Sequence, residues 1–379
     1  MSFFKALNDF NSFLDPANKK ARKLVFYSEK GIYLRYYEGL ISKILEKSDL
    51  EICYLTADLN DPIFQTNNNR IKPFYINNFE SSLFPRLDSK VVVMTLPDLN
   101  QFYIKKTNNK DVNHVYVFHA IGSTHLQYNF GAFDYYDTIF CVGPHQEQEI
   151  RKTEALYNLK PKTLINYGYP YLENVYSQHQ RFLNENKAVE GKKRILVAPT
   201  WGKTCILETC IDKLITALQG TEFEVFIRPH PEFVKRRRKV VNRIAKNLKR
   251  ESNIKMELDL VSGINVHNAD FLITDWSGIA FEYAFGTERP VLFINTPLKI
   301  DNPKYQELDI TPLEVFARDQ IGTTVDMNQF DNIVPILNSF SQESGIYRDR
   351  IVDFRNKYIF NWMKSSEIGA EYIIKLCDK

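Results

Sequence analysis

The feature that most limits the possible folds of this chain is a repeated alternation of short apolar runs with stretches of helical periodicity. Runs such as LVFYS (24–28) and KVVVMTL (90–96) are rich in β-branched and aromatic residues, which is typical of buried strands. The intervening segment YLRYYEGLISKILEK (33–47) repeats apolar residues at helical spacing. Strands that alternate with helices in this way predict a mainly parallel, doubly wound α/β sheet.

The alternation occurs twice, on either side of a polar stretch at 171–193. A chain of 379 residues is too long for one compact core and suits two domains of ordinary size. We therefore predict a Rossmann-like domain over 1–180, a second one over 190–344, and a last helix over 345–379 that crosses back to brace the first domain. Ligands of open α/β sheets bind beyond the carboxyl ends of the strands, so two facing domains predict a cleft lined by two rows of loops.

The charge balance argues against nucleic acid as a partner. The 49 Lys and Arg residues against 46 Asp and Glu residues give a net charge of +3, and no nucleic-acid-binding motif accompanies the basic run at 235–239. We interpret this run as a solvated face of a basic helix over 233–250. Contact with an anionic membrane leaflet or a polyanionic acceptor is the alternative.

The cysteines indicate a reducing compartment. There are five of them, an odd number, and none forms a CxxC pair or a zinc-type spacing with histidine. We therefore expect reduced thiols, no structural zinc and a cytoplasmic protein. The cysteines are Cys53, Cys141, Cys205, Cys210 and Cys377.

The N-terminal segment leaves two interpretations open. It lacks the apolar core and cleavage site of a secretory signal, and no stretch of the chain approaches the roughly 20 apolar residues of a membrane span. Apolar residues recur at helical spacing and four basic residues follow at 19–23. This helix either packs on its own domain or lies as a peripheral anchor on the inner face of the cytoplasmic membrane. The apolar residues are Phe3, Phe4, Leu7, Phe10 and Leu14.

The first group of residues that suggests chemistry is the sequence HVYVFHAIGSTH, in which a strand ends at His119 and a loop leads to His125. A neutral imidazole at the carboxyl end of a strand can accept a proton from a substrate hydroxyl. A histidine that is only hydrogen-bonded within the loop would give the same pattern.

The second group is FIRPHPE, where a strand ends in Arg228, Pro229, His230 and Pro231. The two prolines fix the direction of the backbone, while Arg228 and His230 present donors that suit a phosphate or a departing phosphate group. A rigid turn with a surface arginine is the alternative.

The third group is FLITDWSGIAFEYAFG, in which a buried strand delivers Asp275, Trp276, Ser277 and Gly278 to the start of a helix. Unpaired backbone N–H groups and the helix dipole make such a turn suitable for a diphosphate, with the Ser277 hydroxyl as a further donor. Glu282, one turn into the helix, can reach a ribose diol. Asp275 either contributes to this donor site or caps the helix, because a carboxylate repels phosphate.

Together the three groups resemble the CDP-glycerol glycerophosphotransferase family, which includes teichoic-acid primases and polymerases and relatives in capsule and lipopolysaccharide synthesis. The resemblance covers roughly residues 113–300 and is strongest in IRPHP and in FLITDWSGIAFEYAFGTERPVLFI. It implies a GT-B fold, a CDP-glycerol or CDP-ribitol donor, and a polymer or lipid-linked glycan acceptor whose hydroxyl attacks the β-phosphorus of the donor.

The resemblance also implies residue roles. His119 corresponds to the family's base and His230 to a histidine that steadies the pyrophosphate, while Ser277 and Glu282 correspond to residues that hold phosphate and ribose. The family often shows His-Gly-Thr at the first site. Here the sequence His119-Ala-Ile-Gly-Ser-Thr-His125 departs from it, so His125 is a second candidate for the base. Gly278 replaces the second serine of the family's Asp-x-Ser-Ser turn.

Other chemistries have less support. The sequence lacks a GxxxxGK[ST] phosphate loop, a GxGxxG after a strand, a GxSxG elbow and an HExxH pair. We expect no cofactor and no metal site, and therefore activity that survives a chelator. A glycosyltransferase that uses a nucleotide sugar, a sugar-nucleotide 2-epimerase using Asp98, Asp134 or Asp137, and a non-catalytic scaffold are the alternatives.

Overall fold

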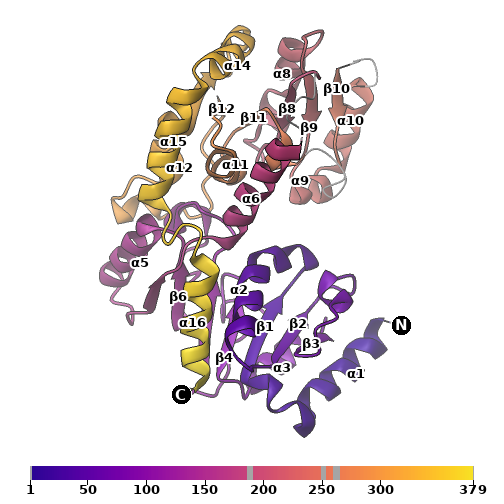
Figure 1. Cartoon of the computed structure of the whole chain (residues 1–379), viewed down its shortest axis with the longest axis vertical. Coiled ribbons are helices and arrows are strands. Elements are labelled where there is room, and N and C mark those ends of the chain that lie inside the picture. Colours follow the sequence, from indigo (N-terminus) through magenta and orange to yellow (C-terminus); the bar gives the residue numbers. More distant parts are fainter. Residues whose placement is uncertain (1, 186–190, 249–252, 259–264, 379) are drawn as a thin grey trace. The chain divides into compact units, whose positions relative to one another are not determined.

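The protein is described by a computed structural model that covers residues 2–185, 191–248, 253–258 and 265–378. The chain forms two compact units (Figure 1). Unit 1 contains Met1–Tyr171, Asn302–Ile310 and Tyr358–Lys379, and unit 2 contains Leu172–Asp301 and Thr311–Lys357. The chain therefore passes from one unit to the other four times.

Unit 1 is built on a sheet of seven parallel strands in the order β3-β2-β1-β4-β5-β6-β7. Central strands such as β1 and β4 are buried along their whole length, as expected where helices cover both faces of a parallel sheet. This confirms the predicted doubly wound α/β class. The strands are β1 (Leu24–Ser28), β2 (Ile52–Thr56), β3 (Ile71–Tyr75), β4 (Val91–Met94), β5 (Asn113–Val117), β6 (Thr138–Cys141) and β7 (Thr163–Asn166).

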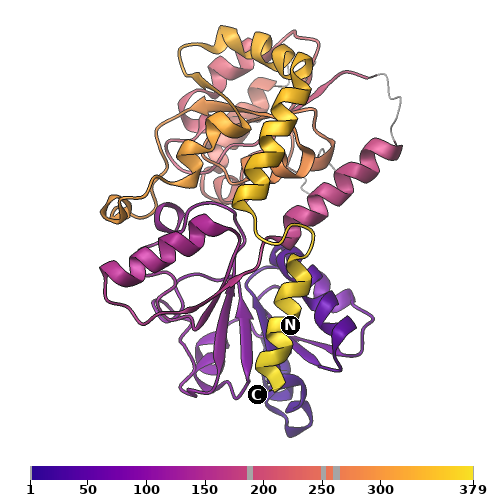
Figure 2. The same cartoon turned by 60° about the vertical axis from the view of Figure 1, so that its left-hand side comes forward.

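The C-terminal helix α16 packs on α2 in the core of unit 1 (Figures 1 and 2). Ile373 and Cys377 are fully buried together with Leu40 and Ile44 of α2. Gly369 allows the close approach, because a Cβ there would lie 2.4 Å from the Tyr167 ring. The helices of this unit are α1 (Ser2–Leu14), α2 (Leu34–Lys47), α3 (Glu80–Leu83), α4 (Thr124–Gln127), α5 (Pro144–Leu156) and α16 (Ser365–Asp378).

The predicted single helix over 345–379 is two helices in the structure. The first, α15 (Ser344–Tyr358), belongs to unit 2 up to Lys357, and α16 belongs to unit 1. Between them Asn361 and Met363 have φ angles of 45° and 64°, which a continuous right-handed helix cannot contain. The apolar periodicity continued across the break, so the sequence pattern did not reveal it.

Helix α1 packs on strand β3 at the edge of unit 1. The ring of Phe13 lies 5.5 Å from that of Phe74, and the Asp9 carboxylate accepts a hydrogen bond from the Tyr75 amide. The first of the two interpretations of this segment is thus observed. At the start of the same helix, Phe3 and Phe4 remain 56% and 69% exposed.

Unit 2 contains a sheet of six parallel strands in the order β10-β9-β8-β11-β12-β13. Its core includes Ile195, Val225 and Ile273 from the strands and Leu214 and Ile244 from the helices. The strands are β8 (Arg194–Val197), β9 (Glu224–Ile227), β10 (Ile254–Met256), β11 (Phe271–Thr274), β12 (Val291–Asn295) and β13 (Gly322–Asp326).

The basic segment of unit 2 forms two helices rather than the one expected over 233–250. They meet at Arg237, and residues 249–250 lie outside the described part of the chain. Residues 235–239 are all exposed, as expected for a solvated face. The helices that begin in this unit or lead into it are α6 (Pro170–Glu185), α7 (Ile206–Thr209), α8 (Ile211–Leu218), α9 (Pro231–Arg236), α10 (Arg238–Leu248), α11 (Ile279–Thr287), α12 (Leu313–Phe316), α13 (Arg318–Ile321), α14 (Ile333–Gln342) and α15.

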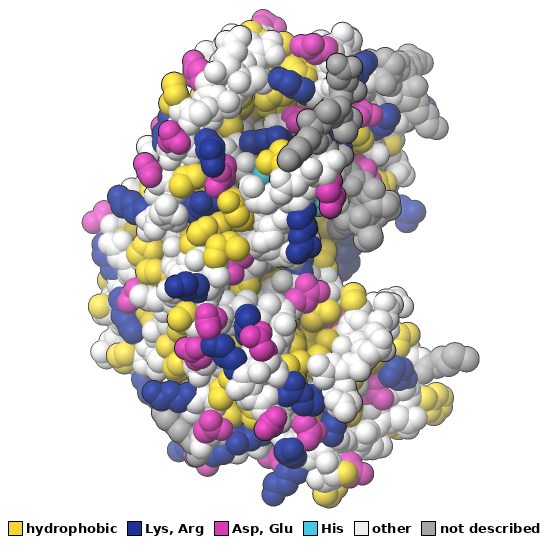
Figure 3. Space-filling model, in the orientation of Figure 1, with side chains coloured by type: hydrophobic (Ala, Val, Ile, Leu, Met, Phe, Trp, Pro, Cys, Tyr) yellow, Lys and Arg dark blue, Asp and Glu magenta, His cyan; other side chains and the backbone are white. Residues whose placement is uncertain are grey.

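The surface carries charges of both signs. On the face shown in Figure 3, Lys and Arg side chains are interspersed with Asp and Glu side chains, which agrees with the near balance of 49 basic and 46 acidic residues. The residues singled out for chemistry follow the carboxyl ends of β5, β9 and β11.

Candidate active site

His119 follows β5 in unit 1, and its surroundings determine which ring nitrogen carries the proton. Nδ1 lies 3.2 Å from the carbonyl oxygen of Thr95. A carbonyl can only accept, so Nδ1 is protonated and Nε2 carries the lone pair. Burial and, to a smaller extent, the Arg35 guanidinium lower the pKa of His119 to about 4, although the Thr95 carbonyl opposes the shift. The imidazole is therefore neutral at pH 7 and able to accept a proton at Nε2.

Aromatic rings surround this imidazole. The ring centroids of Tyr33, Tyr36 and Tyr128 lie 5.7, 6.1 and 6.0 Å from that of His119. These tyrosines and Arg35 were not among the residues predicted from the sequence to lie in the site. A signal was present, because residues 33–36 follow the end of β1, where ligands of such sheets bind.

His125 lies in a different environment. It is 6% exposed, its Nε2 lies 3.1 Å from the Ile310 carbonyl and its Nδ1 lies 3.4 Å from a carboxylate oxygen of Glu149. Glu149 also accepts hydrogen bonds from the backbone N–H and the hydroxyl of Thr124. Both ring nitrogens of His125 thus face acceptors inside unit 1, which suits the fixing of α4 and the 302–310 segment rather than proton abstraction.

Arg228 and His230 follow β9 in unit 2. The Nδ1 atom of His230 accepts a hydrogen bond of 3.1 Å from the Glu232 amide and so caps helix α9. Because Nδ1 is the acceptor, the proton of the neutral ring is on Nε2, which is a donor. The backbone N–H of Arg228 donates a hydrogen bond of 2.8 Å to the Val197 carbonyl of β8. The side chain of Arg228 is half-buried.

Asp275 follows β11 and is only 1% exposed. Its carboxylate accepts hydrogen bonds from the backbone N–H groups of Thr200, Ile206 and Trp276 at 2.7, 2.9 and 2.7 Å. Burial raises the pKa of this carboxyl, against the effect of these hydrogen bonds and of Arg318. These hydrogen bonds tie the loop after β8 and the start of α7 to the end of β11, and the N-cap of α11 is Gly278 rather than Asp275.

Trp276 is held by contacts within unit 2. Its indole N–H donates to the Thr296 carbonyl at 2.8 Å, and the Arg318 guanidinium lies 3.6 Å from the ring centroid. Arg318 is 5% exposed and donates to the Asp275 carbonyl at 2.9 Å. Burial lowers the pKa of Arg318 to about 10, so it stays protonated at neutral pH. Its sequence position gave no sign of this contact, because 43 residues separate it from Asp275.

Ser277 and Gly278 form the turn between β11 and α11, and Gly278 is the N-cap residue. Within the described part of the chain, no acceptor is found for the backbone N–H groups of Ser277, Gly278 and Ile279. A pocket beside this turn is lined by Trp276, Ser277 and Arg318, among others. Free N–H groups at a helix start and a cation at the same pocket favour an anion there. Glu282, in the first turn of α11, is half-buried.

A second cationic group in unit 2 surrounds Trp201, in the loop after β8. The side-chain cations of Lys299 and Arg236 lie 4.5 and 5.0 Å from its ring centroid, and the His230 ring lies 6.3 Å away. Positive charge is therefore present next to the histidine that we assign to phosphate.

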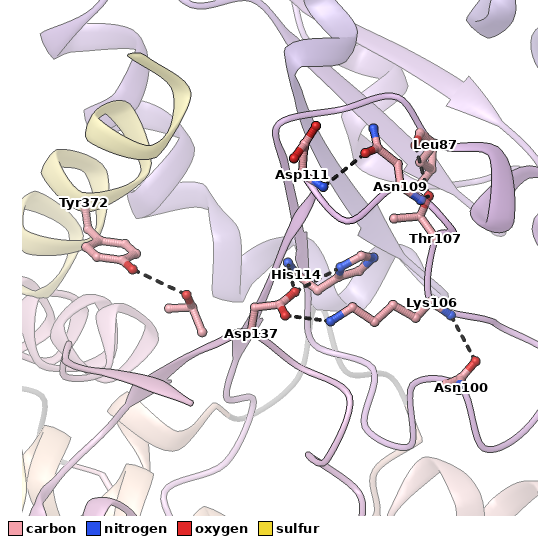
Figure 4. A network of polar contacts seen from close by, with 10 residues as sticks. Leu87, Asn100, Lys106, Thr107, Asn109, Asp111, His114, Asp137 and Tyr372 are labelled. Carbon is pink, nitrogen blue, oxygen red and sulfur yellow. Dashed lines mark hydrogen bonds and ion pairs between the residues drawn. The ribbon is translucent and has the colours of Figure 1, made fainter. Parts of the chain in front are cut away.

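Asp137, one of the carboxylates considered for an epimerase, lies at the other edge of the unit 1 sheet, before β6 (Figure 4). It pairs with Lys106 Nζ at 2.6 Å and accepts a hydrogen bond from the His114 amide at 3.0 Å. Burial alone would raise the pKa of Asp137, but the hydrogen bonds from His114 and Lys106 lower it to about 2. Its contacts are structural. Asp98 and Asp134 are partly buried, and burial raises the pKa of both.

Three further observations concern metal sites, membrane-spanning helices and the cysteines. Among residues 2–185, 191–248, 253–258 and 265–378, no three His, Cys, Asp or Glu side chains gather as a metal site would require. No helix within these ranges is long and apolar enough to cross a membrane. All five cysteines are buried free thiols.

The fold is similar to those of several solved structures. The wall teichoic acid polymerase TagF matches with a TM-score of 0.61 at 15% identity over 100% of this chain and 98% of that one. The UDP-GlcNAc 2-epimerase of Methanocaldococcus jannaschii matches with a TM-score of 0.51 at 12% identity over 93% and 98% of the two chains. At such identities the likeness concerns the fold, and it supports the predicted GT-B architecture.

Sequence similarity identifies the family more specifically than the fold does. The teichoic acid glycerol-phosphate primase of Bacillus subtilis (strain 168) is 25% identical over 186 residues, which are 46% of this chain and 43% of the primase. The match thus spans less than half of that relative's length. Residues 89–362, which hold every candidate site residue from His119 to Glu282, match the family described as CDP-glycerol:poly(glycerophosphate) glycerophosphotransferase. The chain belongs to that family.

Proposed function

We propose that the protein transfers glycerol phosphate, or ribitol phosphate, from a CDP-activated donor to a hydroxyl group of a growing cell-surface polymer or lipid-linked glycan. In the transfer, the acceptor oxygen forms a bond to the β-phosphorus of the donor. The bond from that phosphorus to the bridging oxygen breaks, and CMP leaves. Such a reaction needs alignment and charge stabilisation more than covalent help from the protein.

His119 takes the proton of the acceptor hydroxyl. Its Nδ1–H is directed at the Thr95 carbonyl, so the Nε2 lone pair is the proton acceptor. The lowered pKa keeps this lone pair unprotonated throughout the neutral range. We assign the base to His119 rather than His125, because both nitrogens of His125 face acceptors of its own unit.

Unit 2 holds the donor in this proposal. The diphosphate lies on the turn formed by Ser277 and Gly278, and Glu282 receives the ribose diol. Arg228 and the Nε2–H of His230 stabilise the negative charge that develops on the departing CMP. Asp275 holds the start of this turn through its backbone hydrogen bonds, and Trp276 lines the pocket beside it.

The observation that carries the proposal is that the two histidines have their protons on different ring nitrogens, Nδ1 in His119 and Nε2 in His230. His119 turns Nδ1 to a carbonyl, and His230 turns Nδ1 to an amide. One ring is thereby a proton acceptor and the other a hydrogen-bond donor, as general-base attack and leaving-group stabilisation require.

A thermal-shift panel tests the proposal and identifies the donor. A ligand that binds only the native state stabilises it by RT ln(1 + [L]/Kd), about 2.7 kcal/mol at a hundredfold excess over Kd. We expect CMP, CDP-glycerol or CDP-ribitol to raise the melting temperature, and UDP and UDP-GlcNAc to have little effect. The reverse pattern would contradict the proposal and indicate a sugar transferase or epimerase of similar fold. No response to any nucleotide would indicate a scaffold.

Peripheral contact with the inner face of the cytoplasmic membrane is part of the proposal. The exposed Phe3 and Phe4 of α1 are the groups that would enter the lipid, beside the basic residues at 19–23. Sedimentation with anionic liposomes should decrease in the variant Phe3→Ser/Phe4→Ser. Unchanged sedimentation would exclude α1 as the anchor.

A further inference from the structure

We propose that Arg35 of unit 1 binds a phosphodiester group of the acceptor, one unit behind the hydroxyl that reacts. This inference rests on the proposed function and specifies its acceptor. The protein would extend an anionic, phosphodiester-linked chain in preference to the neutral end of a glycan.

The guanidinium of Arg35 is held in one orientation by two aromatic rings. It lies 5.0 Å from the ring centroid of Tyr36 and 4.6 Å from that of Tyr171. Its amino groups donate to the hydroxyls of the same tyrosines at 2.8 and 3.4 Å. A planar cation that is fixed before binding loses little conformational entropy when it pairs with a phosphate.

Arg35 is also close to the base. Tyr36, which contacts the guanidinium, has its ring 6.1 Å from that of His119. Arg35 is half-buried, so its side chain is partly accessible to solvent. Its positive charge lowers the pKa of the His119 imidazole. The guanidinium is thus separated from the His119 imidazole by the ring of Tyr36, which contacts both.

The position of Arg35 in its helix is unfavourable for stability alone. It is the second residue of α2, and a cation in the first turn of a helix is disfavoured by the helix dipole by about 0.3–1 kcal/mol. The same cation also disfavours the protonated form of His119, which arises when the base has taken the proton. An anion bound at Arg35 would reverse both effects, because it would neutralise the charge.

The chemistry of the acceptor fits this arrangement. In a chain of glycerol phosphates, only the glycerol itself separates the terminal hydroxyl from the preceding phosphodiester. A phosphodiester held by Arg35 would place that hydroxyl at His119. Arginine is well suited to such a group, since its two amino groups can donate to two phosphate oxygens at once.

Transfer assays with full-length protein test this inference through the KM of the acceptor. The variants are Arg35→Gln and Arg35→Lys, and Arg86→Gln is the matched control. Arg86 is an exposed arginine of the same unit, in the turn that precedes β4 at the opposite edge of the sheet. The acceptors are a short glycerol-phosphate oligomer, a glycosyl-diphosphate lipid analogue with its phosphates remote from the reactive hydroxyl, and a neutral glycoside.

We expect Arg35→Gln to raise the KM for the oligomer about 10- to 100-fold, the range for one hydrogen-bonded charge contact. The KM values for the lipid analogue and the glycoside should change less than about twofold. Arg35→Lys should show an intermediate loss, because it keeps the charge without the planar fork. Equal losses for all three acceptors, or none, would overturn the inference, and a loss for the lipid analogue alone would place a lipid diphosphate at Arg35 instead.

A binding measurement separates this inference from the proposed reaction. Titration of the wild-type protein and of Arg35→Gln with the oligomer alone, followed by calorimetry, needs neither donor nor turnover. Weaker binding in Arg35→Gln supports the site even if no CDP-linked donor is used. Equal affinity in the two proteins refutes it, whereas failure of the nucleotide panel would refute the donor assignment only.

Discussion

In each unit a histidine follows the carboxyl end of a strand of the parallel sheet, and the backbone gives the two histidines opposite properties. In unit 1, a carbonyl of a neighbouring loop faces Nδ1 of His119. In unit 2, an amide at the start of α9 faces Nδ1 of His230. Neither histidine needs a carboxylate partner for its tautomer to be fixed. A main-chain group thus determines whether Nε2 accepts or donates. For His119 this group is 24 residues away in the sequence, and for His230 it is 2 residues away.

The units also differ in the buried charge that supports each histidine-bearing edge. Unit 1 buries a carboxylate, Glu149, which contacts His125 and Thr124. Unit 2 also buries a carboxylate, Asp275, but adds a buried guanidinium, Arg318, at the pocket beside Ser277. A buried anion is suited to holding donors of the chain itself, whereas a buried cation adds to the attraction for a bound diphosphate.

Replacement of His119 should have the largest effect and tests the unit 1 half of the comparison. General-base catalysis commonly contributes about 10²- to 10⁴-fold, so His119→Ala should lower kcat by that order. The Kd for CDP-glycerol should stay nearly unchanged, because the donor is assigned to unit 2.

His125→Asn is the matched control for that experiment. It removes a buried imidazole and should lower the melting temperature while retaining kcat per folded molecule. A larger loss of kcat in His125→Asn than in His119→Ala would reverse the assignment of the base.

Two replacements of His230 separate its structural task from its chemical one. Asn is a favourable N-cap residue, so His230→Asn should keep α9 capped but lose the Nε2–H donor. We expect the Kd for CDP-glycerol to rise about 10- to 100-fold, with little change in the melting temperature. His230→Ala should show the same loss of affinity and, in addition, about 1 kcal/mol less stability in urea unfolding. Full affinity in His230→Asn would show that capping is its whole role.

Replacement of Asp137 tests whether the amino ends of the strands in unit 1, where Asp137 lies, differ in function from the carboxyl ends, where His119 lies. Its pKa is lowered to about 2, so the ionised form stabilises the native state above pH 4, and this stability is lost as the pH falls toward 2. Asp137→Asn should reduce the free energy of unfolding by about 2 kcal/mol at pH 7 and by less at pH 3. Turnover per folded molecule should not change. A fall in turnover without a fall in stability would return Asp137 to the list of catalytic candidates.

The pH profile sharpens the comparison further. His119 loses its function only when Nε2 is protonated, and its lowered pKa of about 4 puts this event well below the ordinary value of 6.5. Between pH 7 and 5.5, kcat/KM should therefore change less than about twofold, as far as the base is concerned. Circular dichroism would establish that the protein remains folded. An acidic limb near pH 6.5 would mean that His119 is not the base.

A chelator should have the smallest effect. The turn at Ser277, the cations Arg228 and Arg318 and the donor His230 are the groups that we expect to stabilise the diphosphate. Turnover should accordingly be the same before and after dialysis against EDTA. Complete loss, restored by a divalent cation, would mean that unit 2 needs a metal for the charge that we assign to side chains.

Much of the fold could be predicted from the sequence because its signals are local. Apolar runs predicted the strands. The order of residues along the chain also showed that His119, Arg228 and Asp275 come just after strands. The break at Asn361 was not predicted, because a non-glycine residue in the left-handed region has no strong sequence signature.

The site could be predicted only in part, because its determinants are contacts between distant segments. The Thr95 carbonyl that fixes the tautomer of His119 is 24 residues away, and Arg318 is 43 residues from Asp275. The internal use of the Asp275 carboxylate depends on the amides of Thr200 and Ile206, which follow a different strand, β8. No pattern within one segment contains that information.

The burial of α16 in unit 1 has a consequence for synthesis on the ribosome. Ile373 and Cys377 complete the core around α2, yet they are translated after the whole of unit 2. At about 5–20 residues per second, the chain between Tyr171 and Ser365 takes roughly 10–40 s to make. During that interval the apolar side of α2 lacks its cover, so the nascent N-terminal sheet is a natural client for chaperones until the last helix leaves the exit tunnel.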